Sequence, residues 1–205
     1  RKGLKEYPDG PKIWMKRQII LYERIKRYKI PQILVVVPDY PDDYVHRQLW
    51  YSEKVTNIER TINNVIFALD RYPEIPWMIP IQGHYRDPES IRKSINILRE
   101  YGVLETRRYY GVANLCTERD KEIIARTLQI AREELGSKWI HAFGINLISL
   151  PYVRDLINSF DSMAWTRPVS RILPNHSAKN NFERMLFFFA WYLRYLELTK
   201  NNSRL

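Results

Sequence analysis

An α/β fold with a parallel sheet is predicted for this chain of 205 residues, on three observations. Short apolar segments alternate with amphipathic segments in five successive units, as in strands joined by helical crossovers. Several of the short segments are apolar at consecutive positions, which is typical of parallel strands covered on both faces. The composition, 45% apolar and 27% charged, suits a globular protein, and we expect one domain over residues 1–205.

The first unit begins with a basic helix and a β-branched strand. Residues 13–29 indicate an amphipathic helix whose apolar positions are Ile13, Ile20, Leu21, Ile25 and Tyr28. Residues 33–37 follow as an apolar run between two prolines, and Asp39 lies just past its end. Residues 46–69 then carry one apolar helical stripe: Leu49, Val55, Ile58, Ile62, Val65, Ile66 and Leu69.

The second unit has clear start and stop signals. Residues 76–85 form a short apolar strand that ends at Gln82 and Gly83. Residues 87–102 form a helix in which Asp87 can cap the N-terminus, Pro88 fits the first turn and Gly102 can end it. The predicted buried face of this helix consists of Ile91, Ile95 and Leu98.

Three more units complete the pattern. Residues 107–115 are a strand, and residues 118–135 a helix with Thr117 as its cap and Gly136 as its stop. Residues 138–145 are a strand before a short helix after Ser149, and residues 159–165 are the last strand. Residues 166–181 are polar and basic, which predicts a loop, and residues 181–200 form an aromatic helix. Its apolar residues, available for the core or a dimer interface, are Phe182, Met185, Leu186, Phe189, Tyr192, Leu193 and Leu196.

The charge of the chain favours an anionic partner. Lysine and arginine exceed the acids by 10, and the sequence pI is about 9.7, which suits nucleic acid, although a generally basic surface has the same composition. No apolar run approaches the length of a membrane span, and the N-terminus is too polar for a signal peptide. We therefore expect a cytoplasmic protein that does not contact membranes.

Several cofactor and enzyme classes find no support in the sequence. The single Cys116 excludes an internal disulfide and a multi-cysteine zinc site. The histidines, His46, His84, His141 and His176, lack the spacing of metal ligands. There is no P-loop, no Gly-x-Gly-x-x-Gly and no nucleophile elbow, so we expect neither a metal nor a cofactor.

Polar residues and glycines fall at or just beyond the ends of the predicted strands. They are Asp39, Gln82–Gly83, Gly111–Asn114, Gly144 and Asp161. Because the carboxyl ends of parallel strands form the mouth where ligands bind, these positions are predicted to converge. Each has a simpler interpretation: Asp39 suits a turn or a helix cap, the glycines suit ordinary strand-to-helix turns, and His141 suits the core.

Asp161 is harder to explain as a structural residue. It lies between Phe160 and Met163 in an apolar segment, where a desolvated carboxylate is costly unless it is paired or used. An unrelated parallel α/β glycosidase would use Asp39 and Asp161 as its two carboxylates, separated by roughly 5–10 Å.

The order of motifs resembles the tRNA-guanine transglycosylase family, including its archaeal and DNA-modifying relatives. The segments that carry the resemblance are VVVPDYPDD, NIERTINN, PIQG, YYGVANL and WIHAFGINLISLPYVRDLINSFDSMAWTRPVSR, over about residues 33–171. The Phe-Asp-Ser and Thr-Arg match is the most specific of them. The resemblance implies a TIM-type (β/α)8 barrel of which this chain carries strands four to eight, with the first three strands apparently missing.

The resemblance also implies a reaction and a site. Such enzymes exchange a guanine in a nucleic acid for a 7-deazaguanine, and Asp161 would be the nucleophile that attacks the anomeric carbon and forms a covalent glycosyl-enzyme. The target base would be extruded from its stack. The base would be held by Asp39, Gln82, Gly83, Gly111 and Gly144, and the phosphates by Arg167, Arg171 and Lys179.

Two features of the family have no counterpart here. The acid of the Asp-Ser-Gly-Gly-Phe-like turn is absent, and so is the zinc subdomain that follows the last strand, which makes a DNA-modifying relative a contender beside a tRNA enzyme. The two alternatives to a transglycosylase are a non-catalytic nucleic-acid-binding paralogue and the unrelated glycosidase. The aromatic C-terminal helix also allows a homodimer.

Overall fold

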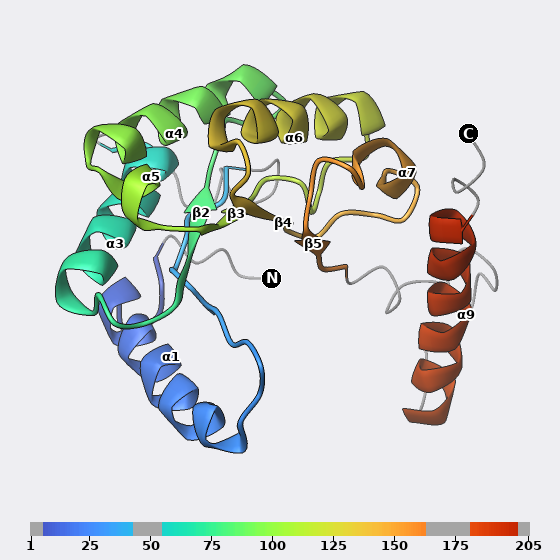
Figure 1. The fold of residues 1–205 in the computed structure, drawn as a ribbon, viewed down its shortest axis with the longest axis horizontal. Coiled ribbons are helices and arrows are strands. Elements are labelled where there is room, and N and C mark those ends of the chain that lie inside the picture. The colour runs from blue at the N-terminus through green and yellow to red at the C-terminus, as the bar shows by residue number, and fades with distance from the viewer. Residues whose placement is uncertain (1–5, 43–54, 163–180, 201–205) are drawn as a thin grey trace.

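The computed structural model describes residues 6–42, 55–162 and 181–200. Five parallel strands pair in chain order, curl into a half-barrel and alternate with helices, which confirms the predicted α/β fold (Figure 1). The strands are β1 (Val35–Val36), β2 (Trp77–Ile81), β3 (Tyr109–Val112), β4 (Trp139–Ala142) and β5 (Ser159–Phe160). All four neighbouring pairs are parallel, so their carboxyl ends share one rim.

The helices lie on the outside of the curled sheet, and α9 lies at the β5 side, where its Tyr195 ring packs against Phe160 of β5 (Figure 1). The longer ones are α1 (Pro11–Ile25), α3 (Asn57–Arg71), α4 (Ile91–Glu100), α6 (Lys121–Leu135) and α9 (Asn181–Lys200). The short ones are η1 (Lys26–Tyr28), η2 (Pro88–Ser90), α5 (Val103–Thr106) and α7 (Leu150–Val153). Among the described residues no helix is long and apolar enough to cross a membrane.

The core lies between the sheet and the helices. All five residues of β2 are buried, and the predicted stripes of α3 and α4 are buried against the sheet at Ile58, Ile62, Val65, Ile91, Ile95 and Leu98. Fully burying side chains of this size is worth about 1.5–3 kcal/mol each before the entropy cost of ordering the chain. This core positions the strand ends relative to one another.

Two predicted helix starts were displaced in the structure. The stripe over residues 46–69 becomes α3 only from Asn57, where Thr56 and Glu59 form a capping box; residues 43–54 lie outside the described part. The cap of α6 is Asp120, whose side chain accepts from the Glu122 N–H, so the prediction of Thr117 was wrong. Asp120 precedes the first helical residue directly, and Thr117 lies too early to reach the free N–H groups.

The predicted apolar face of α1 was wrong, and most of the apolar residues predicted to be available in α9 do not lie in the core of the chain. Exposed positions in α1 and η1 include four of the five predicted apolar residues, namely Ile13, Ile20, Leu21 and Tyr28. Met15 is buried instead, and Ile19 and Tyr22 pack against the core. In α9 the residues against the core are Trp191, Tyr195 and Leu198, whereas the predicted set is exposed at Met185, Leu186, Phe189, Tyr192 and Leu193. Each helix carries apolar residues on more than one face, so periodicity alone could not select the inner one.

Candidate active site

Strand alternation divides the side chains of the sheet between its two faces. In β4, Ile140 and Ala142 are buried under the helices, while Trp139 and His141 are only partly buried on the other face. Register pairs His141 with Ser159 in β5 and with Gly111 in β3, so these residues share the concave face of the half-barrel. The candidate site lies where this face meets the rim.

Asp39 and Gln82 meet at the ends of β1 and β2. The Gln82 side-chain amide nitrogen donates a hydrogen bond to Oδ2 of Asp39, and Gln82 is completely buried. Its other amide atom, Oε1, is buried without a hydrogen-bond partner among the described residues. A buried acceptor without a donor is costly, and this oxygen is enclosed by protein atoms rather than open to solvent.

The N-terminal segment supports the loop that carries Asp39. The Tyr7 hydroxyl donates to the Asp39 backbone carbonyl at 2.7 Å, and burial together with the nearby Asp39 charge raises the pKa of Tyr7. Glu6 accepts from Tyr40 and from Arg60, the latter at 2.7 Å, while the Arg60 guanidinium lies 3.6 Å from the Tyr40 ring centroid. Burial alone would raise the pKa of Glu6, but the hydrogen bonds from Tyr40, the Tyr7 N–H and Arg60 outweigh it and lower that pKa.

A second contact joins the loop after β1 to the loop after β2. Oδ2 of Asp42 lies 3.2 Å from Nδ1 of His84, and Oδ1 accepts from the Asn57 amide, also at 3.2 Å. Asn114, after β3, accepts from the Asp42 N–H at 3.1 Å and donates to the Gly83 carbonyl. The loops after β1, β2 and β3 are therefore connected by side chains at the rim.

Asp161 lies just past β5, on the same rim. Its Oδ1 accepts from the Gly144 N–H at 2.9 Å and lies 3.1 Å from Nε2 of His141, while Oδ2 has no hydrogen-bond partner among the described residues. Its side chain is 53% exposed, so the expectation of a desolvated carboxylate inside an apolar strand was wrong. The strand ends one residue earlier, and this places the carboxylate at the edge of the sheet.

The environment of Asp161 favours the charged form. Partial burial works toward a higher pKa, but hydrogen bonds from His141 and the Gly144 N–H outweigh it and hold the pKa of Asp161 below its usual value. The carboxylate is therefore ionised at neutral pH, as a nucleophile or an electrostatic stabiliser requires.

The predicted glycines are each in close contact with protein atoms. Gly111 lies inside β3 rather than at its end, and a Cβ there would collide with the Phe143 ring. A Cβ on Gly83 would lie 2.7 Å from Ile91 Cγ2. Gly144 has a φ of +69°, and a Cβ there would lie 2.9 Å from the Cys116 Cα. Tight packing thus explains these glycines, and of the three it is Gly144 whose N–H contacts a predicted site residue.

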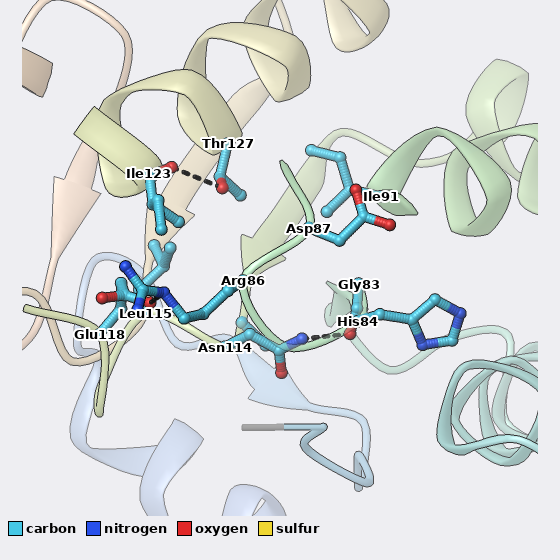
Figure 2. A pocket seen from close by; sticks show the side chains of 11 residues that line it. Gly83, His84, Arg86, Asp87, Ile91, Asn114, Leu115, Glu118, Ile123 and Thr127 are labelled. Atoms are coloured by element: carbon cyan, nitrogen blue, oxygen red, sulfur yellow. Dashed lines mark hydrogen bonds and ion pairs between the residues drawn. The ribbon is translucent and has the colours of Figure 1, made fainter. Parts of the chain in front are cut away.

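A small pocket lies beside the candidate site, between the loops after β2 and β3 and the helices α4 and α6 (Figure 2). Its cavity holds about 20 Å³, room for about one water molecule. Arg86 in its wall pairs with Glu118 at 3.5 Å and Asp120 at 3.3 Å, and the His84 ring extends away from the other lining residues. This pocket is too small for a nucleobase, and Arg86 and Glu118 in its wall are already paired with each other.

The structure brings the predicted residues into two groups. Asp39 and Gln82 form one group at β1 and β2, and Gly144 and Asp161 form the other at β4 and β5. Arg167, Arg171 and Lys179 lie outside the described residues, as do His46 and His176. Among the described residues, no three His, Cys, Asp or Glu side chains come close enough together to hold a metal.

His141 was missed as a site residue because a histidine within a strand suits the core. A signal was present: Trp139 and His141, like Ser159 and Asp161, are two apart, so each pair shares one face of its strand. Asp42, His84 and Asn57 were missed because their pairing depends on how two loops meet in space.

Comparison with protein-family models and with curated proteins finds no match. A function for this chain must therefore be inferred from its own residues and their geometry.

Proposed function

We propose that the chain is a guanine transglycosylase of nucleic acid, whose five strands belong to a TIM-type (β/α)8 barrel and whose nucleophile is Asp161. The observation that carries the proposal is the hydrogen bonding of this carboxylate. Two donors hold Oδ1, while Oδ2 lacks a partner among the described residues and the side chain is 53% exposed. A fixed, ionised and accessible oxygen is what attack on a sugar carbon requires.

In the first step, Oδ2 of Asp161 bonds to the anomeric carbon of the target nucleotide as the bond from that carbon to guanine N9 breaks. The electron pair of the broken bond passes to N9, which takes up a proton as guanine leaves. In the second step, N9 of a 7-deazaguanine loses its proton and displaces Asp161 from the same carbon. The nucleic acid backbone stays intact, and the carboxylate is regenerated.

Asp39 and Gln82 suit the recognition of guanine. The N1–H and exocyclic amine of a guanine-like base are donors, and the two carboxylate oxygens of Asp39 are acceptors at the rim, where the buried Gln82 amide holds one of them in place. Adenine presents an acceptor at N1 and would leave these groups unpaired, which a buried polar site rejects strongly.

Trapping tests the proposal. The protein is mixed separately with guanine-containing tRNA and with duplex DNA in the presence of a competing 7-deazaguanine base, and a denaturation-resistant protein–nucleic acid adduct is sought. We expect an adduct with one of the two substrates that disappears in Asp161→Asn. Asp155→Asn is the matched control, because this aspartate is 90% exposed and, within the described residues, its ion pair is with the neighbouring Arg154.

The outcomes separate the alternatives. An adduct on RNA or on DNA assigns the substrate class. Binding without any adduct contradicts the proposal and favours the nucleic-acid-binding paralogue. Hydrolysis of a simple glycoside that requires both Asp39 and Asp161 contradicts it in favour of the two-carboxylate glycosidase.

A further inference from the structure

The side chain of His141 belongs to a chain of hydrogen bonds that ends at Asp161. The indole N–H of Trp139 donates to Ser159 Oγ at 3.1 Å, Ser159 Oγ lies 2.9 Å from His141 Nδ1, and His141 Nε2 lies 3.1 Å from Asp161 Oδ1. The register of β4 and β5 creates this chain, because it places His141 directly opposite Ser159. Trp139 and His141 alternate along β4 with the buried Ile140 and Ala142, and Ser159 lies opposite His141 in β5. The chain of hydrogen bonds therefore runs along the concave face of the sheet.

The donors and acceptors of this chain fix where its protons lie. An indole N–H can only donate, so Ser159 Oγ is the acceptor in its contact with Trp139. Ser159 Oγ keeps its own proton, which it can donate to an unprotonated His141 Nδ1 at 2.9 Å. A carboxylate can only accept, so the proton of His141 lies on Nε2, between the ring and Asp161.

The ring has little freedom to leave this arrangement. The His141 side chain is 15% exposed, and the Phe143 ring packs edge-on against it with centroids 4.7 Å apart. Both donors to Asp161, the His141 Nε2–H and the Gly144 N–H, meet the same oxygen. The carboxylate is therefore held through Oδ1 with Oδ2 directed elsewhere.

We propose that His141 is a positioning residue, which accepts from Ser159 at Nδ1, donates its Nε2–H to Asp161 and so orients the carboxylate with Oδ2 as the attacking oxygen. The sugar-directed part of this role rests on the proposed function. The single ring proton is committed to Asp161, so His141 does not supply the proton that guanine takes up on leaving. His141→Gln keeps an N–H donor near the position of Nε2, whereas His141→Ala removes it.

Nuclear magnetic resonance tests the arrangement without any substrate. In ¹⁵N-labelled full-length protein at neutral pH, the His141 signals, identified by their loss in His141→Gln, are expected to show a protonated Nε2 and an unprotonated Nδ1. In Ser159→Ala, we expect the preference for this tautomer to weaken. A His141 signal with its proton on Nδ1, or on both nitrogens at neutral pH, would overturn the proposal.

The Asp161 carboxyl gives the second readout. The pKa of this carboxyl, measured from its ¹³C signals across a pH series, is expected to be higher in His141→Ala than in wild type. In His141→Gln it is expected to be intermediate. The groups in contact with this carboxylate among the described residues are His141 and the Gly144 N–H, so a shift reports on His141 directly. An unchanged titration in His141→Ala contradicts the positioning role.

Adduct formation gives the functional readout. Loss of a hydrogen bond to a charged group predicts about a 10- to 100-fold slower adduct rate in His141→Ala at unchanged KM, with most of the rate restored in His141→Gln. Equal adduct rates in His141→Ala and wild type would refute the positioning role of His141. If the wild type forms no adduct, the proposed function fails and the sugar-directed role falls with it, while the two resonance measurements still decide whether His141 orients Asp161.

Discussion

Gly144 shows at the scale of one residue how packing and chemistry meet. Its φ of +69° is one that residues with a side chain rarely adopt, and Cys116 leaves no space for a Cβ. Its N–H donates to Asp161 at 2.9 Å. The turn that brings β4 out of the sheet therefore also supplies one of the two donors that orient the carboxylate.

We expect Gly144→Ala to destabilise the protein by about 2–5 kcal/mol, because about 1–2 kcal/mol of backbone strain adds to about 1–3 kcal/mol of overpacking. Gly102→Ala is the matched control: it has a similar φ of +67° in the left-handed region but its Cβ position has only the Glu105 carboxylate end at 3.8 Å nearby, so only the strain of about 1–2 kcal/mol should appear. Urea unfolding measures the loss in free energy of unfolding for both variants. Equal losses would show that Cys116 does not constrain the turn.

At the scale of elements, the start of α6 shows why local signals compete. Two residues before this helix could serve as its cap, Thr117 and Asp120, and the structure uses Asp120, whose Oδ1 accepts from the Glu122 N–H at 2.9 Å. The Thr117 hydroxyl is buried and has no hydrogen-bond partner among the described residues. The two residues therefore make opposite contributions to stability.

Asp120→Ala should lower the free energy of unfolding by about 1 kcal/mol through loss of the cap. Thr117→Val should be nearly neutral or stabilising, because it replaces an unsatisfied buried hydroxyl by a methyl group of similar size. Thermal and urea unfolding of the two variants check this difference. A larger loss in Thr117→Val than in Asp120→Ala would mean that Thr117 caps the helix after all.

At the scale of the whole molecule, the excess positive charge is unevenly distributed. On the outer surface of α4, α6 and η2, arginines are paired with acids, including Arg92 with Glu89, Glu133 and Glu134, and Arg126 with Glu89. In α1 and its C-terminal extension the basic residues are Lys12, Lys16, Arg17, Arg24, Lys26, Arg27 and Lys29, against the single acid Glu23. All seven are exposed, so within the described residues this helix carries a local excess of positive charge that faces solvent.

We therefore expect binding to nucleic acid to weaken with salt, and Lys16, Arg24 and Lys29 to contribute to that dependence. Replacing all three with glutamine should reduce the slope of log K against log salt by up to about 3, roughly one for each lost phosphate contact. Arg92→Gln with Arg126→Gln is the control, because these arginines are already paired. Fluorescence anisotropy across a salt series measures the slopes, and an equal change in both sets would contradict a role of α1.

The sequence by itself determined the order and kind of the elements, because the periodicity of apolar residues and the helix stops are local. β2, the buried stripes of α3 and α4, and the rim positions of Asp39, Gln82 and Asp161 were predictable for this reason. The pairing of Gln82 with Asp39 and of His141 with Asp161 was decided only by the tertiary structure. These pairs form between residues 43 and 20 positions apart, and their contact depends on strand register and sheet curvature, which no local pattern encodes. The inner faces of α1 and α9 were likewise decided by what packs against them, since each helix carries more apolar residues than one face can bury.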